Sequence, residues 1–120
     1  PVAAIIVDKN SKKIISQSTN HIERNKNSIL HAEIICINKA MAKLKTKYCF
    51  NTEIYINLQP CQMCYTAICI ARISRIYFSA YNNLNGFIYH QPGLHKPEVY
   101  GGIMEDVSTK YLLNFFKKLR

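Results

Sequence analysis

The chain has 120 residues, which is enough for one compact domain with its own core and too few for two. Hydrophobic residues make up 48% of it, which excludes a disordered or fibrous protein. A formal net charge of +9 favours a polyanionic partner, nucleic acid first, although many basic proteins bind nothing acidic. No apolar run approaches the ~20 residues of a membrane span and no segment resembles a signal peptide, so we expect a cytoplasmic protein without a membrane anchor.

Extended and helical patterns alternate along the first half of the chain. Apolar runs over residues 2–7 and 12–16 flank a polar turn, which predicts a hairpin of two strands. A polar loop over residues 17–27 leads into residues 29–45, where apolar side chains recur every three or four positions and predict a helix.

The second half of the chain continues this alternation. The sequence predicts strands over residues 52–57, 75–80 and 98–100, helices over 61–71 and 103–120, and a long irregular connection over 81–97. Residues 1–120 are therefore expected to form a single domain of the α/β class, a three-layer α-β-α sandwich with a five-stranded mixed sheet.

Two cysteines follow a proline in Pro60-Cys61-Gln62-Met63-Cys64, at the predicted start of a helix. Positions i and i+3 share one helix face, so both thiols can bind a single metal ion. Proline suits this position because its missing N–H is not needed at a helix start, and the helix N-terminus favours thiolates. A redox pair and two packed cysteines are the alternative interpretations. A disulfide framework is not expected, because the cysteines number five and the chain lacks secretory features.

His31 and Glu33 fall in the first turn of the helix predicted over residues 29–45. An isolated histidine is more often a core or surface residue than a metal ligand. At the first turn of a helix, however, both side chains can converge on one ion, the histidine as a ligand and the glutamate just outside the ligand shell. Glu33 would then be the base that moves protons beside the metal.

The number of ligands separates structural from catalytic zinc, because structural sites have four protein ligands and catalytic sites have three plus water. Cys36 and Cys69 each lie five residues after a proposed ligand, about 140° around an ideal helix, so neither should reach the metal. We expect both, like Cys49, to be small buried or half-buried residues. The expected ligands of one zinc ion per chain are His31, Cys61 and Cys64.

The pair of motifs His31-Ala32-Glu33 and Pro60-Cys61-Gln62-Met63-Cys64 resembles the H-x-E and P-C-x-x-C signature of the zinc-dependent, cytidine deaminase-like superfamily. More narrowly, the chain resembles bacterial tRNA-specific adenosine deaminases over nearly its whole length, including residues 71–73, 97–103 and 112–120. This resemblance implies a cytidine deaminase-like fold. It also implies an enzyme that converts adenosine to inosine at the wobble position of tRNA anticodons, with tRNA-Arg bearing an ACG anticodon as the expected target.

The same resemblance implies partners and further site residues. The tRNA anticodon stem-loop would be the partner, and its binding site would be shared across the interface of a homodimer. Glu33 would carry protons during the hydrolytic loss of ammonia, while Asn20, otherwise a simple turn residue, would hydrogen-bond the flipped adenine. The residues expected to contact substrate or RNA are Asn20, Asn82, Phe115, Phe116, Lys117 and Arg120.

The chain departs from the family pattern at several positions. Gln59 stands where the family usually has Glu, and Asn82 and Leu84 stand where it usually has Asp and Lys. The connection over residues 81–97 is therefore where the chain differs most from the family. The family's amino-terminal helix is expected to be missing from the chain.

Two other functions are compatible with the motifs. A deaminase of free nucleobases or nucleotides, of guanine or cytosine type, would use the same zinc site, although the basic charge favours RNA as substrate. A catalytically silent, zinc-stabilised RNA-binding subunit is the second alternative. Such a subunit is expected to lack the proton-carrying glutamate, and Glu33 is present.

Overall fold

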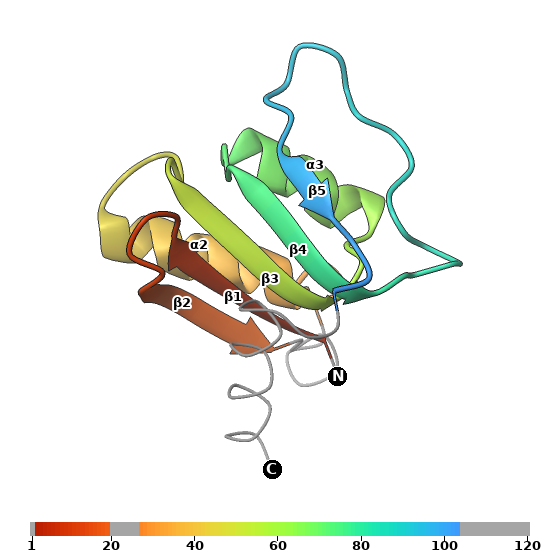
Figure 1. Ribbon diagram of the computed structural model, residues 1–120, viewed down its shortest axis with the longest axis horizontal. Helices are drawn as coiled ribbons and strands as arrows, with labels where there is room; N and C mark the ends of the chain where they lie inside the picture. The colour runs from red at the N-terminus through yellow and green to blue at the C-terminus, as the bar shows by residue number, and fades with distance from the viewer. Residues whose placement is uncertain (1, 20–26, 104–120) are drawn as a thin grey trace.

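The structure is a computed structural model that describes residues 2–19 and 27–103. Five strands form one sheet in the order β2-β1-β3-β4-β5, and two helices cover it (Figure 1). The strands are β1 (Ala3–Asp8), β2 (Ile14–Thr19), β3 (Thr52–Leu58), β4 (Arg75–Ala80) and β5 (Glu98–Tyr100), and the helices are α2 (Ala32–Leu44) and α3 (Gln62–Ile70).

The sheet is mixed because its strands are connected in two different ways. β1 pairs antiparallel with β2 through a short turn and antiparallel with β3 on its other side. β3 and β4 pair in parallel, as do β4 and β5. A parallel pair needs a crossover connection, and α3 supplies it between β3 and β4. As a result α2 and α3 both begin at one end of the sheet and finish at the other.

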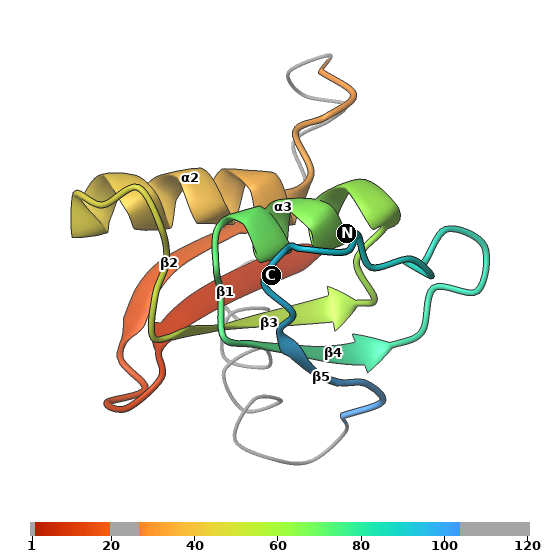
Figure 2. The same ribbon diagram turned by 90° about the horizontal axis from the view of Figure 1, so that it is seen from above.

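Both helices pack on the same face of the sheet, as Figure 2 shows from above. Ile37 of α2 and Ile68 of α3 meet alternate strand residues such as Ile54 there, and together they form the main core. The intervening strand residues face the opposite side of the sheet, as the period of two in a strand requires. The smaller apolar cluster on that side consists of Ala3, Ile5, Val7 and Tyr55.

The predicted five-stranded mixed sheet and the order of its elements are confirmed, with boundaries that shift by up to three residues. α2 begins at Ala32 and α3 at Gln62, so His31 and Cys61 directly precede their helices, where the sequence placed both inside a first turn. The helix predicted over residues 103–120 would form the third layer; residue 103 is described and is not helical, and residues 104–120 lie outside the described residues. Among the described residues, no helix is long and apolar enough to cross a membrane.

Candidate metal centre and active site

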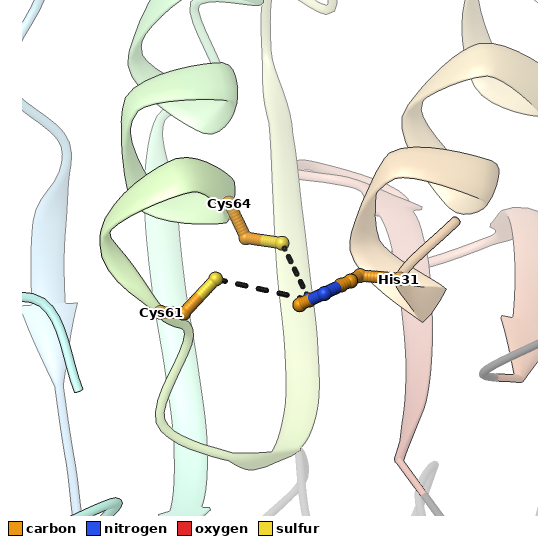
Figure 3. A group of neighbouring side chains, drawn as sticks. All are labelled: His31, Cys61 and Cys64. Carbon is orange, nitrogen blue, oxygen red and sulfur yellow. Dashed lines mark hydrogen bonds between the residues drawn. The ribbon is translucent and has the colours of Figure 1, made fainter. Parts of the chain in front are cut away.

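His31 is positioned at the start of α2 by the backbone around it. It is the N-cap residue, with extended backbone (φ −69°, ψ 155°), and its carbonyl accepts a hydrogen bond from the N–H of Ile35 at 3.1 Å. The next carbonyl, that of Ala32, accepts a hydrogen bond from the Ser18 hydroxyl of β2 at 2.5 Å. The His31 side chain does not cap its own helix, and Figure 3 shows the ring directed at the start of α3.

Cys61 and Cys64 lie at the start of α3, directly after β3. The buried Pro60 connects the strand to the helix, and Cys61 follows as the N-cap residue with extended backbone (φ −69°, ψ 171°). Cys64 lies in the first turn and is fully buried. An N-cap residue and the third residue of its helix can approach the same point, so the two thiols lie on the side of α3 that faces His31.

The three side chains converge from two helices on one point (Figure 3). Nδ1 of His31 lies 3.7 Å from Sγ of Cys61 and 3.5 Å from Sγ of Cys64, and all three ligand atoms lie within 4.8 Å of one another. Tetrahedral zinc with ordinary Zn–N and Zn–S bond lengths separates its nitrogen and sulfur ligands by about 3.6 Å. The residues therefore fit zinc, and a set of three protein ligands leaves the fourth tetrahedral position for water or substrate.

The buried position of Cys64 disfavours its thiolate form unless a positive charge lies beside it. Burial, together with the nearby Glu33 and Cys61, raises the pKa of the Cys64 thiol. A bound metal ion would supply the adjacent positive charge that a thiolate at this position needs.

Glu33 lies in the first turn of α2, beside the metal ligands. Its side chain is only 3% exposed, and it lines a pocket together with His31 and Cys61. Burial raises the pKa of its carboxyl group, although its own backbone N–H and the His31 ring oppose the shift. The pocket thus holds a titratable carboxyl group within the same small volume as the ligands, which is the arrangement that acid–base catalysis next to a metal requires.

The remaining three cysteines lie outside the metal centre. All three are buried, which confirms the prediction that they are small buried residues. Sγ of Cys36 lies 3.2 Å from Oγ of Ser16, and burial raises the pKa of this thiol to about 12. Cys69 is buried on α3 with Sγ 3.9 Å from Nδ1 of His90. Cys49 is part of the main core.

One wall of the pocket is the turn that follows β4, and Gln59 holds this turn in place. Oε1 of Gln59 accepts a hydrogen bond from the N–H of Asn82 at 3.1 Å. Oδ1 of Asn82 accepts one from the N–H of Asn85 at 3.0 Å, and the Asn82 carbonyl accepts one from Gly86 at 2.9 Å. Gly86 in turn forms an isolated β-bridge with Cys61. The turn over residues 82–86 is therefore joined to the segment that carries a metal ligand.

This wall contains one predicted residue and two that sequence reasoning missed. Asn82, predicted to contact substrate, does line the pocket, while Gln59 and Asn85 line it without having been predicted to. Gln59 directly precedes the Pro-Cys motif, and that position was the available signal. Gly86 marks the turn itself, because an added Cβ would lie 2.6 Å from the Asn82 carbonyl oxygen and closer still to Oε1 of Gln59.

A second set of contacts holds the next part of the connection against α3. Oε1 of Gln62 accepts hydrogen bonds from the N–H groups of Ile88 and Tyr89 at 3.1 and 3.0 Å, and Nε2 of Gln62 donates to the Tyr89 carbonyl at 2.6 Å. Tyr65 stacks on Phe87 with ring centroids 4.0 Å apart. The predicted irregular connection is thus anchored along α3, the helix that Cys61 precedes.

The other residues predicted to contact substrate or RNA have no described position. They fall within residues 20–26 and 104–120, outside the part of the chain that the structure describes. These residues are Asn20, Phe115, Phe116, Lys117 and Arg120.

Comparison with known proteins places these features in a family. The family model for the cytidine and deoxycytidylate deaminase zinc-binding region matches residues 1–80. A tRNA-specific adenosine deaminase of Rickettsia bellii is 38% identical to the chain in an alignment that covers 100% of this chain and 88% of that protein.

Solved structures with the same fold are also known. One, from work on A-to-I editing by tRNA:A34 deaminases at the wobble position of transfer RNA, has a TM-score of 0.78 and 32% identity over 85% of this chain and 82% of that chain. Another, a guanine deaminase from Nitrosomonas europaea, has a TM-score of 0.76 and 22% identity over 96% of this chain and 72% of that chain. The second likeness concerns the fold alone.

Proposed function

This chain belongs to the zinc-binding cytidine and deoxycytidylate deaminase family and is a hydrolytic deaminase, and we propose that it converts adenosine to inosine at the wobble position of a tRNA anticodon. The observation that carries the proposal is the convergence of His31, Cys61 and Cys64 on one point, beside a pocket that His31 and Cys61 line together with the buried Glu33. The Rickettsia relative supports the choice of substrate, because its likeness to this chain extends from end to end. The proposed target is tRNA-Arg with an ACG anticodon.

The proposed metal ligands and Glu33 have separate tasks. His31, Cys61 and Cys64 would hold one zinc ion per chain. When bound, this ion supplies the Lewis acidity that activates water at neutral pH. Glu33 accepts a proton from water in the pocket and delivers protons to the purine ring and to the departing ammonia, because its carboxyl group is buried beside the ligands.

Recognition of the RNA is proposed to involve residues inside and outside the pocket. Asn82 is proposed to contact the flipped base, because it lines the pocket and its backbone N–H donates a hydrogen bond to Gln59. Asn20 is proposed to hydrogen-bond the adenine. The proposed contacts to the anticodon stem-loop at the carboxyl end of the chain are Phe115, Phe116, Lys117 and Arg120, where aromatic and basic groups can meet unstacked bases and phosphates.

The chain is further proposed to act as a homodimer in the cytoplasm. The support for the dimer is the resemblance to a family whose tRNA site is shared between two subunits. The support for the cytoplasm is the proposed substrate and the requirement that Cys61 and Cys64 stay reduced to bind a metal. Light scattering of the zinc-loaded protein tests the dimer, and a mass of one chain at working concentration would contradict it.

The experiment that tests the function is incubation of the zinc-loaded protein with full-length tRNA-Arg carrying ACG, followed by nucleoside mass spectrometry. We expect inosine at the wobble position and no product from free guanine, cytosine or cytidine. A tRNA-Arg transcript with G at the wobble position is the matched RNA control and should remain unchanged.

A protein control separates chemistry from binding. Glu33→Gln removes the proton carrier and keeps the size of the side chain, so we expect zinc content to stay at one per chain while turnover falls ~10²–10⁴-fold. Absence of inosine from tRNA with release of ammonia from a free base would contradict the tRNA proposal in favour of a nucleobase deaminase. Full turnover by Glu33→Gln would contradict the role of Glu33.

A further inference from the structure

The end of the sheet opposite the metal centre brings together connections that are distant in sequence. The turn between β1 and β2 bonds to the connection before β3, through the N–H of Lys9 and the carbonyl of Asn51 at 2.8 Å. The same connection bonds to the end of α3, through the N–H of Cys49 and the carbonyl of Ala71 at 2.7 Å. Both views of the molecule show this end far from the starts of α2 and α3 (Figure 1 and Figure 2).

Exposed cations gather on these connections. Their side chains come from the β1–β2 turn, the last turn of α2, the segment after it, the corner after α3 and the segment before β5. We call this set the basic pole. It consists of Lys13, Lys43, Lys45, Lys47, Arg72 and Lys96, all of them exposed.

The carboxylates near the basic pole are engaged by other groups. Glu53 is fully buried and pairs with Lys12 at 2.5 Å and Arg75 at 3.0 Å, and Glu98 lies 3.4 Å from Arg75. Asp8 accepts hydrogen bonds from the backbone at the tip of the β1–β2 turn. Among the described residues, no carboxylate forms an ion pair with a side chain of the basic pole.

Two of these cations occupy backbone positions that favour glycine. Lys45 ends α2 with φ 55° and Arg72 follows α3 with φ 63°, both in the left-handed region. Glycine is the usual residue at such helix ends because it has no Cβ to clash. The negative end of the helix dipole gives a structural reason for Lys43 and Lys45. It gives none for Lys13 or Lys96, which lie away from helix ends.

Aromatic rings lie among the cations. The Tyr48 ring has Nζ of Lys47 at 5.4 Å and the Arg72 guanidinium at 4.9 Å from its centroid. Phe50 packs against Tyr48 with ring centroids 5.4 Å apart and is itself 59% exposed. Cations that bind phosphates, next to an exposed ring on which a base can stack, are the two components of single-stranded RNA-binding surfaces.

The metal pocket has the opposite character, since no Lys or Arg is among the described residues that line it. The pocket can therefore select a base, but its described lining offers the RNA backbone no positive charge. α2 alone, with its 13 residues, separates the pocket from the basic pole by about 20 Å. A single nucleotide in the pocket does not reach the pole, whereas a longer RNA does.

We propose that the basic pole is a second RNA-contact surface, which binds the phosphate backbone at a distance from the nucleotide in the metal pocket and stacks an unpaired base on Phe50. The proposal rests on the proposed function only for the choice of tRNA as the RNA. Binding at the basic pole requires neither zinc nor turnover.

The test compares the affinity of two triple variants for full-length tRNA across a series of salt concentrations. Lys43→Gln with Lys47→Gln and Arg72→Gln removes three charges from exposed positions. Lys43→Arg with Lys47→Arg and Arg72→Lys keeps them and is the matched control. In the glutamine variant we expect the slope of log affinity against log salt to become shallower by about 2, because each phosphate contact contributes about 0.7–0.9. The control should keep the slope of the parent protein.

Three results would overturn the proposal. One is an unchanged slope and affinity in the glutamine variant, with folding verified by its melting temperature. Another is loss of affinity for heparin without loss of affinity for tRNA, which would assign the surface to a different polyanion. The third is an unchanged affinity for unstructured RNA in Phe50→Ala together with an unchanged slope in the single variant Lys47→Glu. If the proposed tRNA deamination is wrong, no inosine forms, but the salt slopes of the glutamine variant and the control variant still differ. If the basic pole does not bind RNA, inosine forms and the two slopes agree.

Discussion

The two ends of the sheet carry opposite kinds of side chains, and the shared direction of the two helices accounts for the part of the difference that lies at helix ends. At one end both helices begin, and His31 and Cys61 are their N-cap residues. At the other end both helices finish, and Lys45 and Arg72 follow their last turns. Positive helix ends favour thiolates and negative helix ends favour cations, so one parallel arrangement separates a metal centre from a basic pole.

The two ends also differ in how strongly their side chains depend on neighbouring residues for their positions. The metal end consists of buried and half-buried groups, next to elements that are held by Ser18, Gln59 and other neighbouring residues. The basic pole consists of exposed side chains on turns, each of which can change without disturbing a core. Substitutions at the metal end should therefore have large effects on activity, whereas those at the pole should have small effects on stability and graded effects on binding.

The largest effect is expected at the metal end, from Cys64→Ala. Removing one of three ligands leaves the site unable to hold its ion firmly, so zinc and turnover should both fall to background. Metal analysis and the tRNA assay measure the two quantities. Cys69→Ala is the matched control, because Cys69 is a buried cysteine of the same helix outside the ligand group. One zinc ion per chain retained by Cys64→Ala would contradict the assigned ligand set.

The next largest effect is expected from Glu53→Gln, which neutralises the buried carboxylate at the same end of the sheet as the basic pole. Glu53 is fully buried, while the side chains of its partners Lys12 and Arg75 are 36% and 29% exposed. Because water can partly solvate these two cations, we expect a loss of about 2–3 kcal/mol in the free energy of unfolding, less than for a fully buried pair. Denaturant titration measures it, and Glu98→Gln, at a largely exposed carboxylate, is the control.

The same variant should change the dependence of stability on pH. Burial opposes ionisation of Glu53, but hydrogen bonds from Lys12, Tyr55 and Arg75 outweigh it and hold the carboxyl pKa below its ordinary value of 4.5. The stabilisation is therefore complete above about pH 4.5 and is lost as the pH falls through the folded-state pKa. The difference in stability between parent and Glu53→Gln should narrow on acidification. A difference that stays constant down to acid unfolding would contradict the lowered pKa.

A moderate effect confined to the metal end is expected from Gly86→Ala. The added Cβ would lie 2.6 Å from the Asn82 carbonyl oxygen, so the pocket wall must shift, at a cost of ~1–3 kcal/mol. We expect kcat/KM for tRNA to fall while the affinity of the basic pole stays the same. Gly93→Ala, in the same connection, is the control for backbone strain without a clash at the pocket, because φ is 89° there and nothing lies within 4 Å of the added Cβ. Equal losses of kcat/KM in both variants would mean that the turn does not shape the site.

The smallest effect is expected at the basic pole, from Lys45→Gly. Glycine relieves the left-handed backbone at φ 55°, so the free energy of unfolding should rise by ~0.5–1 kcal/mol while RNA affinity falls. Lys43→Gly is the matched control, since Lys43 lies inside α2 and glycine there should destabilise by ~1 kcal/mol. A rise in stability without loss of RNA affinity would remove Lys45 from the proposed surface.

Much of the fold could be predicted because its signals are local. The apolar run of β1 and the helical spacing before Lys45 indicate their elements directly, and the Pro-Cys motif locates the start of α3 within one residue. The clustering of His31, Cys61 and Cys64 could be predicted for a chemical reason, since few other uses combine paired cysteines with a histidine and a glutamate at helix starts.

The parts that could not be predicted depend on contacts between distant segments. The place of Gln59 beside the Pro-Cys motif is visible in the sequence, but its hydrogen bond to the turn over residues 82–86 forms only when that turn folds back onto it. The basic pole is similar, because Lys13 and Arg72 come to lie at the same end of the sheet only after the sheet is assembled. The tasks of Asn20 and of the carboxyl-terminal residues stay predictions, as they lie outside the described residues.

The bridge between Cys61 and Gly86 joins a proposed zinc ligand to the turn that forms one wall of the pocket. With Cys61 as a ligand, a change that loosens the turn over residues 82–86 would weaken the hold on the ion. By thermodynamic reciprocity, loss of the ion would loosen the turn by the same free energy. Substitutions in this turn are therefore expected to change the pocket wall and the metal affinity together.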